Sequence, residues 1–88
     1  MITVQGTPSI GHVVACCETI VRAKSPALNW AHNYAQHLID MVEKGECGAR
    51  ELRAQVLYVR DNLSHWRGPE ARAVRRTLDL WLKHTTGE

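Results

Sequence analysis

Apolar residues recur every three or four positions over most of this 88-residue chain, which is the spacing of amphipathic helices. The clearest example is segment 26–44. One stripe along it consists of Leu28, Ala31, Ala35, Leu38 and Val42. A second stripe beside the first consists of Trp30, Tyr34, His37 and Met41. Ser25 and Pro26 suit the start of a helix and Gly45 suits its end, so we predict a helix over 26–44.

Three further segments show the same period. Segment 8–23 follows Thr7 and has apolar residues at Ile10, Val13, Val14, Cys17, Ile20 and Val21. Segment 48–66 has an apolar stripe on one side, which consists of Leu52, Val56, Val59, Leu63 and Trp66. Leu57 and Tyr58 widen this stripe. Segment 69–84 follows Gly68, and its predicted inward-facing residues are Ala71, Val74, Leu78 and Trp81. We predict helices over all three ranges, although the Val, Ile, Thr and Cys content of 8–23 also favours a strand.

The predicted fold is all-α, a small antiparallel bundle of three to four helices in a single domain over 1–88. Connections of about two to five residues favour antiparallel neighbours. Residues 1–7 alternate like a strand but have no partner strand, so we expect a short extended tail, or an arm that pairs only in a dimer.

Composition agrees with a folded protein and adds one asymmetry. Hydrophobic residues make up 44% and charged residues 23%, which argues against disorder. Residues 1–46 carry three basic and four acidic side chains, whereas 47–88 carry eight and five. The net charge of +2 therefore comes from the C-terminal half, which contains the last two predicted helices.

The three cysteines cannot all pair within one chain. The N-terminus lacks the basic and apolar regions of a secretory signal, and no apolar run approaches a membrane span. We therefore expect a reduced cytoplasmic protein with free thiols. His12 and Cys16 would share a helix face, but a structural zinc needs four ligands. We predict buried, inert thiols and no metal; a zinc site and a reactive thiol are the alternatives.

No arrangement of residues indicates catalysis. Ser64 and His65 are adjacent on a predicted helix and would point apart. His37 and Asp40 are three apart and can hydrogen-bond, but no nucleophile or glycine-rich loop accompanies them. We predict that the protein is not an enzyme and has no catalytic residue or cofactor.

The stretch NWAHNYAQHLID has an unusual solvent side, with amides, His32 beside them, and no formal charge before Asp40. Amides lose less hydration than charges on burial, so they tolerate an interface. Trp and Tyr are enriched at binding hot spots. The predicted protein interface consists of Asn29, Trp30, Asn33, Tyr34, Gln36 and His37. Self-association into a homodimer is the favoured interpretation; a foreign protein partner and ordinary solvent surface are the alternatives.

The last helix suggests a second function. Its polar side carries several basic residues, Lys83 included, with Asp79 among them. A small nucleic-acid-associated regulator would use Arg67, Arg72, Arg75 and Arg76 for contact. The other interpretation is a solvated amphipathic helix, because the charge excess is small and no helix-turn-helix is evident. Nucleic-acid binding is thus the alternative function.

Three segments, SPALNWAHNYA, ELRAQVLYVRDNLSHWRG and EARAVRRTL, resemble a group of small phage- and prophage-associated proteins of unknown function. The resemblance covers roughly Ser25 to Lys83 and omits 8–23. It implies a helical fold and an origin in a mobile element, and it carries over no functional residue. Together with the interface prediction, it suggests a phage- or prophage-encoded interaction module that acts on a host protein.

Overall fold

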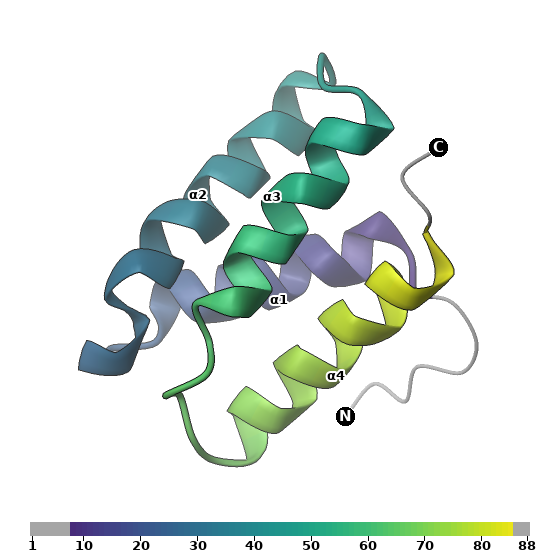
Figure 1. The fold of residues 1–88 in the computed structure, drawn as a ribbon. Coiled ribbons are helices and arrows are strands. Elements are labelled where there is room, and N and C mark those ends of the chain that lie inside the picture. The colour runs from purple at the N-terminus through teal and green to yellow at the C-terminus, as the bar shows by residue number, and fades with distance from the viewer. Residues whose placement is uncertain (1–7, 86–88) are drawn as a thin grey trace.

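The computed structural model describes residues 8–85 and consists of helices and their connections (Figure 1). The four α-helices are α1 (Ile10–Arg22), α2 (Asn29–Lys44), α3 (Ala49–Asp61) and α4 (Pro69–His84). A 3₁₀ turn, η1 (Pro26–Leu28), leads directly into α2. The predicted all-α bundle is confirmed, whereas the predicted tail over 1–7 lies outside the described residues.

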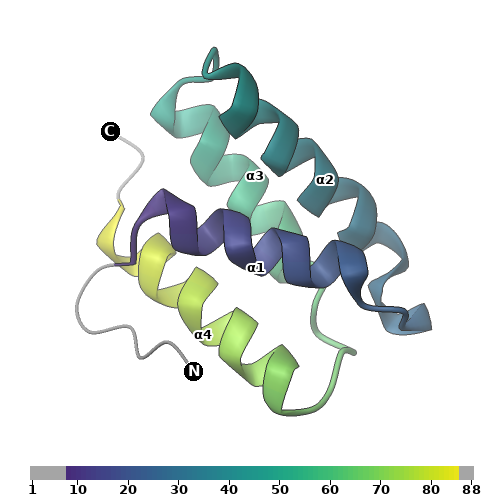
Figure 2. The same ribbon diagram turned by 180° about the vertical axis from the view of Figure 1, so that it is seen from behind.

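The helices close around one core. α2 and α3 lie side by side as an antiparallel hairpin, and α1 crosses behind α3 in Figure 1 and in front of it in Figure 2. Contacts join α1 to α2, α2 to α3, α3 to α4, and α4 back to α1. Each helix therefore buries one side against two neighbours and keeps an outer side for solvent or a partner.

The core is built largely from the predicted stripes, but the second stripe of segment 26–44 contributes no buried residue, because Trp30 and His37 are exposed and Tyr34 and Met41 are half-buried. The buried apolar residues are Val13, Cys17, Ile20, Leu28, Ala31, Ala35, Leu38, Val56, Val59, Leu63, Trp66, Ala71, Val74, Leu78, Trp81 and Leu82. Ile10, Val14, Val42, Leu52 and Leu57 are half-buried against them. Val21 is a partial exception to the predicted stripes, because it lies at an exposed edge of α1.

The boundaries of three helices differ from the prediction, and α2 is one of them, because it begins at Asn29 after the 3₁₀ turn η1. α1 begins at Ile10, because Ser9 is its N-cap and the Ser9 backbone N–H donates to Nδ1 of His12 at 2.9 Å. The third helix ends at Asp61 rather than at 66. After Asp61 the chain turns through i→i+3 bonds, such as the 3.0 Å bond from the Trp66 N–H to the Leu63 carbonyl. Leu63 and Trp66 thus reach the core from turns and not from a helix.

Two glycines set the ends of helices. Gly45 takes the left-handed conformation (φ 67°) and donates its N–H to the Met41 carbonyl at 3.1 Å, as expected for a C-cap. Gly68 has φ 112° and ψ 173° and precedes Pro69 at the start of α4. This backbone conformation is essentially restricted to glycine. Gly68 therefore allows the chain to reverse between α3 and α4.

Candidate functional site

The outer side of α2 carries the amides that the sequence places there, and it also carries His37, which the sequence places in the second stripe of this helix. Asn29, Asn33, Gln36 and His37 are all exposed, and we call these four residues the amide face. The Gln36 Nε2 donates to Oδ1 of Asp40 at 3.1 Å, which ties one edge of the face to the first acidic residue of the helix. From Asn29 to His37 the helix carries no Asp, Glu, Lys or Arg.

His32 does not belong to this face, although the sequence places it beside the amides. Its Nε2 lies 2.7 Å from the carbonyl oxygen of Ala23, and the residue is half-buried. Ala23 follows the last residue of α1, and its carbonyl lies outside any helix. His32 therefore tethers the connection between α1 and α2 and is not offered to a partner.

An aromatic ridge borders the amide face along the seam between α2 and α3; we define it as Trp30, Tyr34 and Tyr58. The rings of Tyr34 and Tyr58 have centroids 5.7 Å apart. Trp30 is 65% exposed and Tyr58 is 54% exposed, whereas Trp66 and Trp81 are buried. Three of the five aromatic side chains of the protein thus lie at this one surface.

Tyr58 was expected to widen the buried stripe of α3, and that expectation is wrong. The buried side of α3 consists of Gln55, Val56 and Val59. Tyr58 lies instead at the edge of α3 that faces α2. The Gln55 Nε2 donates to the Tyr34 carbonyl at 2.9 Å and so fixes the two helices in register. Sequence periodicity alone could not assign Tyr58 to the ridge, because its position depends on how α2 packs beside α3.

One end of the ridge opens into a shallow depression of about 630 Å³. Residues from η1 and the start of α2 form one wall, and residues at and after the end of α3 form the other. The lining consists of Pro26, Ala27, Asn29, Trp30, Asp61, Asn62, Ser64 and His65. The depression therefore extends the surface around Trp30 with polar groups.

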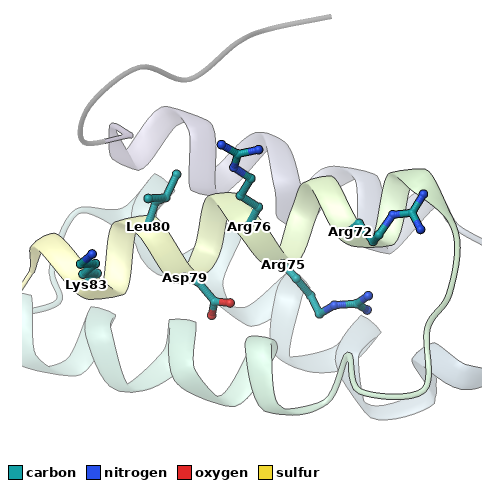
Figure 3. Close-up of a pocket in the computed structure, with 6 residues that line it drawn as sticks. All are labelled: Arg72, Arg75, Arg76, Asp79, Leu80 and Lys83. Carbon is teal, nitrogen blue, oxygen red and sulfur yellow. The ribbon is translucent and has the colours of Figure 1, made fainter.

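The outer side of α4 carries the basic residues (Figure 3). An open depression of about 390 Å³ is lined there by Arg72, Arg75, Arg76, Asp79, Leu80 and Lys83. Arg72, Arg76 and Lys83 are exposed, and we call these three residues the cationic stripe. Arg67 is also exposed but precedes the helix and does not line the depression.

Arg75 has a structural task that the sequence does not reveal. Its Nη1 donates to the carbonyls of Leu63 and Trp66, at 3.1 and 2.6 Å. The residue is half-buried and satisfies carbonyls in the turns that follow α3. The prediction that the Arg75 side chain is free to contact a nucleic acid is therefore wrong. Its positive charge nevertheless lies close to the cationic stripe.

The cysteines are free thiols in unequal environments. Cys17 is fully buried, and burial raises the pKa of its thiol to about 12. Burial also raises the pKa of the half-buried Cys16, whose side chain hydrogen-bonds to Thr77. Cys47 is half-buried near the start of α3. Among residues 8–85, no three His, Cys, Asp or Glu side chains gather as a metal site would require.

Comparisons of the chain with protein-family models, with curated proteins and with solved structures find no match. The resemblance to phage and prophage proteins therefore stays an expectation from the sequence. None of the helices within residues 8–85 combines the length and apolar composition needed to cross a membrane.

Proposed function

We propose that this protein is an interaction module that forms a homodimer through the amide face and the aromatic ridge. The observation that carries the proposal is the exposure of Trp30, at 65%, beside the Tyr34–Tyr58 pair, in a chain that buries its other two tryptophans. Aromatic side chains of this kind are the usual anchors of protein interfaces.

Covering the ridge would supply a useful driving force. At about 25 cal/mol per Å², removing roughly 100 Å² of aromatic ring from water contributes about 2.5 kcal/mol for each chain. The rings of Trp30 and Tyr58 are exposed and can still be buried by a partner. The half-buried Tyr34 lies on α2 with Trp30 and contacts Tyr58 on α3. The ridge runs along two helices, so a partner would rest on a surface broader than α2 alone.

The chemistry of the amide face favours a second copy of this chain over a foreign protein. A two-fold axis brings the same patch of both subunits together, so a charged patch would meet its own charge. Amides avoid this conflict, because each amide both donates and accepts and can pair with another amide. Asn33 and Gln36 are exposed amides in the charge-free part of α2. A foreign protein, such as the host protein that the phage resemblance implies, is the alternative occupant.

The double variant Asn33→Lys/Gln36→Lys tests this surface, because it places two cations where two copies would meet. Ala15→Lys/Ala73→Lys is the matched control, since both alanines are exposed and lie on α1 and α4. We expect the wild type and the control to sediment at twice the chain mass of 9.9 kDa, and the double variant at the chain mass. A wild type that sediments as a monomer, or a double variant that keeps the dimer mass, contradicts the proposal.

A further inference from the structure

The cationic stripe lies on a different helix from the proposed dimer surface and has its own geometry. Arg72, Arg76 and Lys83 follow one another at intervals of four and seven residues, which keeps them on one side of α4 (Figure 3). At about 1.5 Å per residue, the stripe spans roughly 17 Å of helix axis. All three side chains are exposed, so their charges face solvent.

The one acidic residue that lines the depression is paired with an arginine outside it. Asp79 accepts from Nε and Nη2 of Arg60 in α3, at 2.7 and 3.3 Å. Arg60 thus balances the Asp79 charge from the side facing α3. The hydrogen bonds of Arg75 go to neutral carbonyls, so its positive charge is not balanced. The depression therefore has a clear positive excess, although the whole chain has a net charge of only +2.

We propose that the cationic stripe binds the phosphate backbone of a nucleic acid. A row of cations along a helix is complementary to a partner whose negative charges also repeat along a line, as phosphodiesters do. Contacts of this kind hold the protein on the duplex and read no sequence. The inference does not rest on the dimer, because α4 carries no residue of the amide face or the aromatic ridge.

The other residues that line the depression indicate whether this binding would depend on the nucleic-acid sequence. The depression is lined by no Asn or Gln that would read base edges and by no aromatic ring that would stack on a base. Its one apolar member, Leu80, is half-buried, which leaves little apolar surface for insertion into a membrane. The expected contact is therefore sequence-independent and dominated by counterion release.

Counterion release makes the inference quantitative. Three phosphates neutralised by one chain predict a slope of about −2.7 in a plot of log affinity against log salt for duplex DNA, at roughly 0.9 per phosphate. A dimer that applies both stripes doubles this slope. The slope is measured by fluorescence anisotropy with a labelled duplex of mixed sequence, between about 50 and 200 mM NaCl.

The variant Arg72→Gln/Arg76→Gln/Lys83→Gln removes the stripe with a good helix former at each position. The control is Arg22→Gln/Lys24→Gln/Lys44→Gln, which removes the same charge from exposed cations outside α4. We expect the control to keep the affinity of the wild type within a few fold, and the stripe variant to lose at least tenfold. Circular dichroism is the control measurement, and we expect it to show that both triple variants keep their helices.

Three outcomes would overturn the inference. The first is no detectable binding of the duplex by the wild type at the lowest salt. The second is an equal loss of affinity in both triple variants, which would show that only net charge matters. The third is binding of poly-glutamate that depends on the stripe without binding of the duplex, which would assign the surface to an acidic protein.

Discussion

The ring of Tyr34 in α2 lies against the ring of Tyr58 in α3, with centroids 5.7 Å apart and planes tilted by 31°. This pair joins the two helices of the hairpin at the surface and not in the core, since Tyr58 is 54% exposed. The same two rings thus hold the hairpin together and leave aromatic surface open beside Trp30.

The tyrosine pair should show direct energetic coupling. Aromatic pairs contribute about 0.5–1.5 kcal/mol beyond their burial. We expect Tyr34→Ala and Tyr58→Ala to lower the free energy of unfolding by amounts that are not additive in the double variant, with a coupling in this range. Urea unfolding of the four proteins of the cycle measures it. Additive effects would show that the ring contact has no energetic weight.

Arg75 should contribute to the free energy of unfolding, whereas the exposed Arg72 on the same helix should not. Arg75→Met leaves the Leu63 and Trp66 carbonyls without this donor, which costs about 1–3 kcal/mol. Arg72→Met removes the same charge from the exposed stripe and should change the unfolding free energy by less than about 0.5 kcal/mol. Equal effects of the two substitutions in thermal or urea unfolding would refute the structural role of Arg75.

Gly68 should tolerate substitution less well than Gly45. No heavy atom stands within 4 Å of a Cβ added at either position, so the cost of alanine comes from the backbone alone. At Gly68 the φ of 112° is unfavourable for any side chain, and we expect Gly68→Ala to cost about 1–3 kcal/mol. Gly45→Ala, at φ 67°, should cost about 1–2 kcal/mol. A neutral Gly68→Ala in urea unfolding would contradict the observed turn.

The buried Cys17 thiol predicts a loss of stability in alkaline solution. Its pKa rises from an ordinary 9.0 to about 12 in the folded protein. Between these values the unfolded chain binds fewer protons at this thiol than the folded chain does, so the free energy of unfolding falls as pH rises above about 9. The Cys17 contribution is complete below that pH.

Urea unfolding between pH 8 and 11 measures this effect. We expect Cys17→Ala to be less stable at pH 8, because it leaves a small cavity, but to lose less of its stability as the pH increases. Tyr and Lys side chains titrate in the same range in both proteins, so the difference between the two slopes isolates Cys17. Identical slopes would mean that Cys17 ionises freely in the folded state.

Much of the fold follows from the sequence because helical periodicity is a local signal. The stripes through Leu38, Val59 and Leu78 identify the core sides of α2, α3 and α4 without any knowledge of their neighbours. The same signal correctly leaves Asn33 and Gln36 on the outside of α2. The amide face was therefore predictable.

Features that depend on packing between helices were not predictable from periodicity. Arg75 and Arg76 are adjacent in the sequence, yet only Arg75 faces the turns after α3, because α4 lies beside them. On α3, the polar Gln55 is buried against the Tyr34 carbonyl, whereas the aromatic Tyr58 is exposed. α3 ends at Asp61, where the C-cap residue Asn62 donates from its side chain to the Tyr58 carbonyl at 2.8 Å, and Arg75 donates to carbonyls of the turns that follow.

The exposure of Trp30 in solution is the most direct test of the proposed dimer. Trp66 and Trp81 are 6% and 8% exposed, so acrylamide quenching of tryptophan fluorescence reports mainly on Trp30. If two copies meet at the aromatic ridge, the wild type will be quenched less than Asn33→Lys/Gln36→Lys at the same concentration. Equal quenching of the two proteins would contradict the account, because it would leave Trp30 in water whether or not the chain self-associates.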